Sequence, residues 1–150
     1  MLLPDAYQES MFVTAAYAVL ELESGRLVYA SAGHNPALLL PLAGKPEWLR
    51  CKGAVLGVME SIDLQERSFV MGTGDHLVFY TDGVTEAFSP QGDIYGEERL
   101  LAAAQAVAQA AAGSSAQAMV EAILASVREF VGEGPVSDDL TLLVLHRSMP

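Results

Sequence analysis

The chain of 150 residues has the size of one domain and is long enough to bury a substantial apolar core. Nineteen acidic residues against eight Lys and Arg give a net charge of −11, which argues against binding to nucleic acids or anionic membranes, because both require basic patches. No stretch has the length and apolar character of a membrane span, and the single cysteine, Cys51, excludes an internal disulfide and suits a reducing, cytoplasmic environment.

The first half of the chain predicts β-structure. Turn signals separate short apolar stretches that are predicted to be strands, over residues 12–23, 27–32, 37–41, 48–51, 65–71 and 76–80. The segment Glu23–Arg26 predicts a hairpin between the first two strands, and Gly72–Asp75 predicts a second hairpin between the last two.

The second half predicts two helices. The first covers residues 97–112, with two acids in its first turn that complement the helix dipole, and Gly113 ends it. The second is predicted to begin with a capping box, because Ser114 stands three residues before Gln117. Its apolar residues follow the helical period, so that one face must pack on another element; they are Met119, Val120, Ile123, Leu124, Val127, Phe130 and Val131.

A last strand is predicted over residues 140–146, and its weak alternation favours a central place in a sheet. Strands followed by a helical pair predict an α+β fold with layers of sheet and helix. No internal repeat or linker separates a second domain, so we expect residues 1–150 to form a single domain.

Two acidic corners border apolar runs. Asp82 comes directly after the predicted strand 76–80, and Asp138 and Asp139 stand just before residues 140–146. Carboxylates at the ends of buried strands cost desolvation free energy unless positive charge lies beside them, and hard divalent cations prefer corners made only of oxygen ligands. Gly83 is expected to let the backbone turn away from Asp82. The corners together suggest half of a metal site, although each aspartate could also simply cap a turn.

Four short motifs occur in a fixed order along the chain: Met11-Phe-Val-Thr14, Ala32-Gly-His-Asn-Pro36, Thr81-Asp-Gly83 and Asp138-Asp-Leu-Thr141. In this order they resemble metal-dependent serine/threonine protein phosphatases of the PPM type, and most closely the bacterial branch similar to stage II sporulation protein E. The resemblance implies an antiparallel β-sandwich flanked by helix pairs. It also implies hydrolysis of phosphoserine or phosphothreonine on a regulatory protein of a sigma-factor or stress-signalling pathway.

The resemblance further implies roles for particular residues. Asp82 and Asp138 would be ligands of Mn²⁺ or Mg²⁺. Asp139 would be the structural partner of Asp138 or the ligand in its place, because adjacent residues of an extended chain point to opposite sides. Gly83 and His34 would support the ligands through the backbone or as a second layer around the metal.

The chain lacks the Gly-Asp-Val-Ser-Gly-type stretch in which this family carries an aspartate that bridges two metal ions. We therefore expect residues 1–150 to be the C-terminal two-thirds of a phosphatase-like domain, incomplete at the N-terminus and a poor enzyme by themselves. In the complete domain, two ions about 3.5–4 Å apart would hold a water molecule in line with phosphorus.

The implied partner is a phosphorylated regulator of the anti-sigma factor antagonist type. The hydrophobic content of 51% and the strand edges expected in an incomplete sandwich favour a homodimer. Two other classes of function remain open at this stage. One is a non-catalytic pseudophosphatase that binds a partner protein, and the other is an interaction module whose aspartates only cap turns, which a metal titration would distinguish.

Overall fold

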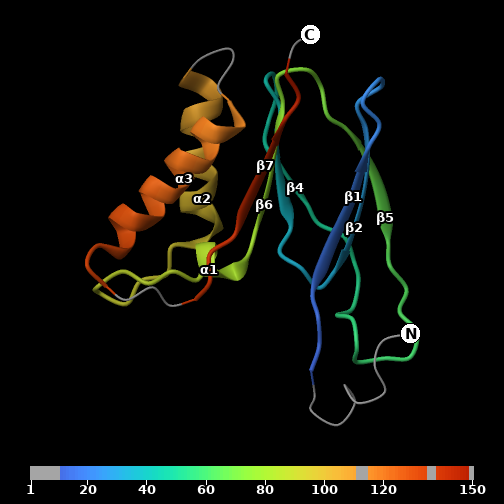
Figure 1. The fold of residues 1–150 in the computed structure, drawn as a ribbon, viewed down its shortest axis with the longest axis horizontal. Helices are drawn as coiled ribbons and strands as arrows, with labels where there is room; N and C mark the ends of the chain where they lie inside the picture. The colour runs from blue at the N-terminus through green and yellow to red at the C-terminus, as the bar shows by residue number, and fades with distance from the viewer. Residues whose placement is uncertain (1–10, 111–114, 135–137, 149–150) are drawn as a thin grey trace. The chain divides into compact units, whose positions relative to one another are not determined.

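The computed structural model describes residues 11–110, 115–134 and 138–148. They form two compact units, each built around one antiparallel sheet (Figure 1). The first unit contains residues 1–36 and 49–70, and the second contains residues 37–48 and 71–150. The predicted α+β class with antiparallel strands is confirmed. None of the helices in the described residues has the length and apolar character needed to cross a membrane.

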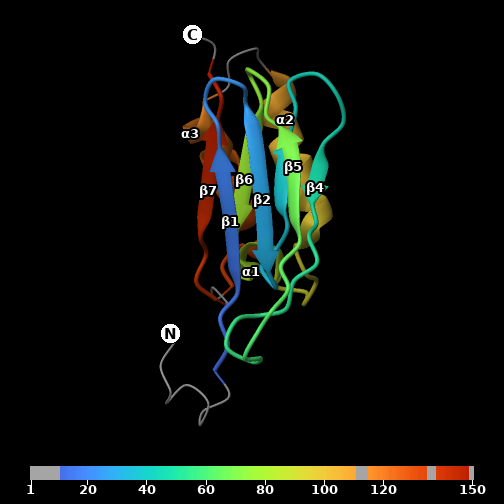
Figure 2. The same ribbon diagram turned by 90° about the vertical axis from the view of Figure 1, so that its right-hand side faces the viewer.

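The first unit holds a three-stranded sheet in the order β1–β2–β5 (Figure 2). Its strands are β1 (Ala15–Leu20), β2 (Arg26–Ala32) and β5 (Glu66–Val70). The first predicted hairpin is confirmed, because β1 and β2 pair antiparallel and the amide of Gly25 donates to the carbonyl of Glu21. Gly25 has a φ of 75°, a conformation that a glycine adopts without steric cost.

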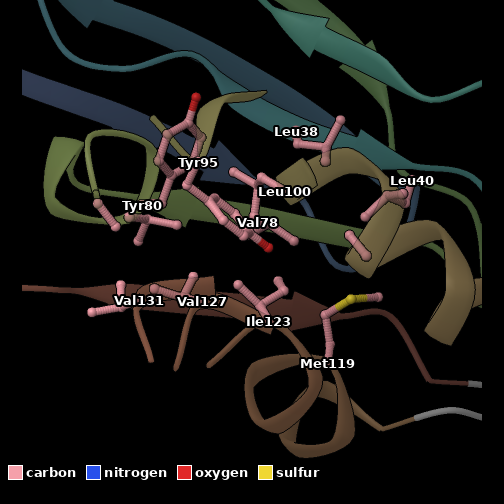
Figure 3. Close-up of a cluster of buried hydrophobic side chains, with 13 residues drawn as sticks. Leu38, Leu40, Val78, Tyr80, Tyr95, Leu100, Met119, Ile123, Val127 and Val131 are labelled. Carbon is pink, nitrogen blue, oxygen red and sulfur yellow. The ribbon is translucent and has the colours of Figure 1, made fainter. Parts of the chain in front are cut away.

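The second unit holds a four-stranded sheet in the order β4–β3–β6–β7. The strands are β3 (Ala37–Leu40), β4 (Glu47–Leu49), β6 (His76–Tyr80) and β7 (Leu142–His146), and the helices are α1 (Asp82–Thr85), α2 (Gly96–Ala110) and α3 (Ala116–Val131). Helices α2 and α3 lie together on one face of this sheet (Figure 1). Side chains from α3, including Ile123 and Val127, pack with Val78 and Tyr80 of β6 in the apolar core (Figure 3).

The period of α3 explains this packing. Met119, Ile123, Val127 and Val131 recur every four residues and are all buried, as expected for the inward stripe of an amphipathic helix. The hydroxyl of Ser115 caps the helix by accepting a hydrogen bond from the amide of Ala118 at 3.1 Å. The predicted capping residue Ser114 lies outside the described residues.

The second predicted hairpin is wrong. Strand β5 pairs with β2, whereas β6 pairs with β3 and β7, so the two strands belong to different sheets. The reason lies in Asp75, whose buried carboxylate accepts one hydrogen bond from the amide of Gly72 at 2.6 Å and another from the amide of Leu42 at 2.7 Å. The turn is therefore tied to the end of β3 instead of closing a ladder between β5 and β6.

The predicted central place of the last strand is also wrong. Within the described residues β7 pairs only with β6, so it forms an edge of its sheet. Leu142 and Val144 pack against the core, while Leu143 and Leu145 on the other face are 56% and 37% exposed. The strand has apolar residues on both faces, but only one face is buried. The sequence pattern shows the apolar residues and cannot show which face is covered.

Candidate metal centre

The two acidic corners lie side by side in the second unit. Thr81 follows β6 and Thr141 precedes β7, and the amide of Thr81 donates to the carbonyl of Thr141 at 3.1 Å. In return, the amide of Thr141 donates to Oγ1 of Thr81 at 3.0 Å. The hydroxyl of Thr81 donates to the carbonyl of Asp139 at 3.3 Å. These bonds extend the β6–β7 ladder and hold the segment after β6 against the segment before β7.

Gly83 explains how closely the two segments approach. A Cβ placed on this buried residue would collide with the carbonyl oxygen of Asp139 and would lie 3.0 Å from the carbonyl carbon of that residue. The carbonyl oxygen of Asp138 would be 3.5 Å away. Gly83 is not among the described glycines with a positive φ. The chain does turn from β6 into α1 at this point, but what requires a glycine is the room that it leaves for the neighbouring backbone.

The three aspartates of the corner are exposed. Oδ1 of Asp82 accepts a hydrogen bond from the amide of Gly83 at 3.1 Å, and Oδ1 of Asp138 accepts one from the amide of Asp139 at 2.7 Å. Because water reaches these carboxylates, their charge does not carry the desolvation cost that the sequence argument invoked. A metal site here is therefore supported by the donors that the corner brings together and not by a need to neutralise buried charge.

The oxygen atoms of the corner are of the type that binds Mn²⁺ or Mg²⁺, but the described part of the corner brings together too few ligating side chains for a complete site. The corner offers carboxylate and backbone carbonyl oxygens, which are the ligands that hard divalent cations prefer. Among the residues that the structure describes, however, no group of three or more His, Cys, Asp or Glu side chains could hold a metal ion. The corner fits part of a metal site, and the assignment of Asp82, Asp138 and Asp139 as ligands stays a prediction.

His34 lies in the first unit, in the turn after β2. Its Nδ1 lies 3.1 Å from Oγ1 of Thr14, its amide donates to Oγ of Ser31 at 3.2 Å, and the same hydroxyl donates to the carbonyl of His34 at 3.1 Å. These contacts fix the turn that follows the strand. A supporting role toward the metal stays a prediction.

The sequence reasoning missed a cavity that borders the metal corner. Its volume is about 410 Å³, and it is lined by Gly83 and Leu140 of the corner together with residues of α3. Leu124, Val127 and Val131 supply an apolar wall, and Arg128 is the one charged residue among the described residues that line the cavity. The sequence carried little signal for it, since Arg128 lies at the edge of the apolar stripe of α3 and not within it, and the stripe was interpreted only as a packing face.

Comparison with known proteins gives a consistent picture. The family model described as Stage II sporulation protein E (SpoIIE) matches residues 2–148. Protein IcfG of Synechocystis sp. is 30% identical over 142 residues, a match that covers 93% of this chain and 21% of that protein. The phosphoserine phosphatase RsbU of Bacillus subtilis is 32% identical over 141 residues, covering 93% of this chain and 40% of that protein. The chain therefore spans less than half the length of these two relatives.

A solved structure agrees in fold. The SiaA-PP2C domain of Pseudomonas aeruginosa superimposes with a TM-score of 0.75 at 19% identity, and the match covers 93% of this chain and 54% of that one. At this identity the likeness concerns the fold alone. It agrees with the α+β class and with the antiparallel sheets described above.

Proposed function

This chain belongs to the stage II sporulation protein E family, and on that premise we propose that it forms part of a protein phosphatase domain that hydrolyses phosphoserine or phosphothreonine. The observation that carries the proposal is the junction of Thr81 and Gly83 with Asp139, which holds the carboxylates of Asp82 and Asp138 on neighbouring segments. The family contains phosphoserine phosphatases related to RsbU.

The resemblance to phosphatases of the PPM type implies Mn²⁺ or Mg²⁺, and RsbX, a protein of similar fold, was solved in complex with magnesium. When bound, such ions lower the pKa of a water molecule and offset the charge of the phosphate group. In this chain Asp82 and Asp138 would hold one ion, and Asp139 would orient Asp138 or replace it as a ligand. The hydroxyl of Thr81 would keep the two carboxylates in register, because it belongs to the segment that carries Asp82 and makes two hydrogen bonds to the segment that carries Asp138.

The proposed substrate is a phosphorylated regulatory protein of the anti-sigma factor antagonist type. The support is family membership together with the similarity to RsbU, a phosphoserine phosphatase of Bacillus subtilis. The net charge of −11 would repel a phosphorylated protein, so metal ions at the corner would be needed for productive binding.

A non-catalytic role is the second candidate. It is favoured by one observation, namely that no described group of three acidic, His or Cys side chains could hold a metal. In that case the domain would keep the fold and bind a regulatory partner without hydrolysis. The partner would then bind equally well with and without metal ions.

Metal binding and hydrolysis measured on the same variants separate these functions. Titration with Mn²⁺ in a calorimeter should detect weak binding to residues 1–150 that Asp82→Asn reduces strongly. Release of phosphate from a phosphoserine peptide should be measured in parallel, on residues 1–150 and on the longest product of the gene that encodes them. Metal binding that Asp82→Asn leaves unchanged would contradict the proposed site, and metal binding without hydrolysis in either product would favour the non-catalytic role.

A further inference from the structure

The cavity next to the metal corner is built like a small binding pocket. Its volume of about 410 Å³ falls within the roughly 300–1,000 Å³ that is usual for pockets that bind small groups. Leu124 and Val127 of α3 and Leu140 of the corner make an apolar wall. Because Gly83 and Leu140 also belong to the acidic corner, a molecule in the cavity would lie directly beside that corner.

Arg128 gives the cavity a charge. Its side chain is exposed in the last turn of α3, and within the described part of the chain its guanidinium has no hydrogen-bond or ionic partner. Arg99 makes a useful contrast, since it donates to the carbonyls of Ile94 and Tyr95 and lies over the ring of Phe130. In a chain with a net charge of −11, a guanidinium that has no partner among the described residues and borders an apolar cavity marks a site for a carboxylate, which it can bind through two parallel hydrogen bonds.

We propose that this cavity binds a segment of the substrate protein in which an aliphatic side chain stands close to an acidic residue. The aliphatic side chain would enter the apolar cavity, and the carboxylate would pair with Arg128. This inference rests on the proposed function in one respect, namely that the same segment carries the phosphorylated residue to Asp82. The cavity and Arg128 would then select the sequence around the phosphoserine.

Equilibrium binding of labelled peptides tests the proposal without requiring turnover. Phosphoserine peptides are prepared in which a Leu and a Glu are moved one position at a time along either side of the phosphoserine. Fluorescence anisotropy with Mn²⁺ present gives the affinity of each peptide for residues 1–150. One arrangement should bind best. Replacing its Leu with Ala should weaken binding roughly tenfold, as for a lost aliphatic group in an apolar pocket, and replacing its Glu with Gln should weaken it roughly fivefold.

Two variants with matched controls assign these effects to the cavity. Arg128→Gln should remove the preference for Glu over Gln and keep the preference for Leu, while Arg26→Gln, which removes another exposed arginine, from β2, should change neither. Leu124→Gln should remove the preference for Leu, while Val120→Gln on the same helix should keep it. Circular dichroism establishes that each variant is folded.

The results of the peptide-binding experiment can be distinguished from a failure of the proposed phosphatase activity. Equal binding of all arrangements, or a preference for Glu that survives Arg128→Gln, would overturn the inference even if the protein hydrolyses phosphoserine. If Arg128→Gln instead weakens binding of phosphorylated peptides and not of their unphosphorylated forms, Arg128 contacts the phosphate and the carboxylate assignment is wrong. Selective binding through Arg128, with no hydrolysis by the longest product of the gene, would support the inference and contradict the proposed activity.

Discussion

Gly83 and Asp139 lie so close that a methyl group on the glycine would collide with the carbonyl oxygen of the aspartate. The two residues are far apart in the chain and belong to the segments that carry the predicted metal ligands. Hydrogen bonds from Thr81 to the same segment reinforce this contact. The geometry of the corner therefore depends on Gly83, which leaves space for the backbone of Asp139, and on Thr81, which bonds to the segment before β7.

The first prediction concerns this lack of space. Gly83→Ala should lower the free energy of unfolding by about 1–3 kcal/mol, as expected when a well-packed site is overfilled, and should weaken Mn²⁺ binding because the corner must open. Denaturation with urea measures the first effect and calorimetry the second. Gly92→Ala is the control, since a Cβ there meets nothing within 4 Å. The only cost of that substitution is the backbone strain of an alanine at a φ of 87°. A smaller loss for Gly83→Ala than for Gly92→Ala would contradict the account.

The second prediction concerns the hydroxyl that joins the corners. Thr81→Val preserves the shape of the side chain but removes the acceptor of the Thr141 amide and the donor to Asp139. The free energy of unfolding should fall by about 0.5–1.5 kcal/mol, the net contribution of a hydrogen bond, because the amide that loses its partner is exposed to water. Thr73→Val replaces an exposed threonine in the turn before β6 and should have little effect. Equal stabilities of the two variants would show that the hydroxyl does not hold the corner.

The third prediction concerns Asp75, the buried acid that ties the turn before β6 to the end of β3. Asp75→Asn replaces one acceptor oxygen of the carboxylate with an NH₂ group, which is a donor. This NH₂ group would face the backbone N–H of Gly72 or of Leu42. A loss of about 1–3 kcal/mol is expected, because one buried backbone donor becomes unsatisfied. Asp63→Asn, at an exposed position, serves as the control for the change in charge. Thermal unfolding of the two variants under the same conditions decides the matter.

The fourth prediction is a dependence on pH. Burial raises the pKa of Tyr95 above its usual value of 10.0, and its hydroxyl lies 2.8 Å from Oγ of Ser126. In the unfolded chain the phenol loses its proton first, so the stability that Tyr95 contributes is complete below pH 10.0 and falls as the pH rises toward the folded pKa. The difference in unfolding free energy between the wild type and Tyr95→Phe should shrink above that pH. A constant difference would mean that the two states share one pKa.

Much of this structure follows from local sequence. The helical period of α3 predicts its buried stripe, and Glu23–Arg26 predicts the hairpin of β1 and β2. These features depend on residues that are neighbours in the chain. The four ordered motifs place Asp82 and Asp138 at the ends of strands, and the ladder between β6 and β7 then brings their segments together.

The features that escaped prediction depend on distant residues. The sequence predicts a hairpin of β5 and β6 because only a turn separates these strands. In the structure β5 pairs with the distant strand β2, and the hydrogen bond from Leu42 to Asp75 ties the turn to the end of β3. The role of Gly83 arises from backbone that lies far along the chain. The cavity beside Arg128 likewise exists only once α3 packs near the corner.

The most direct test of the central claim is metal-dependent release of phosphate from a phosphoserine peptide by the longest product of the gene, compared with residues 1–150. Residues 1–150 should release phosphate at little above background, since two carboxylates supply only part of a site for two ions. In the longest product of the gene, Asp82→Asn and Asp138→Asn should each abolish Mn²⁺-dependent release, because a ligand charge is lost while the side-chain shape is kept, and Asp139→Asn should reduce it less. Robust release that survives Asp82→Asn would contradict the account.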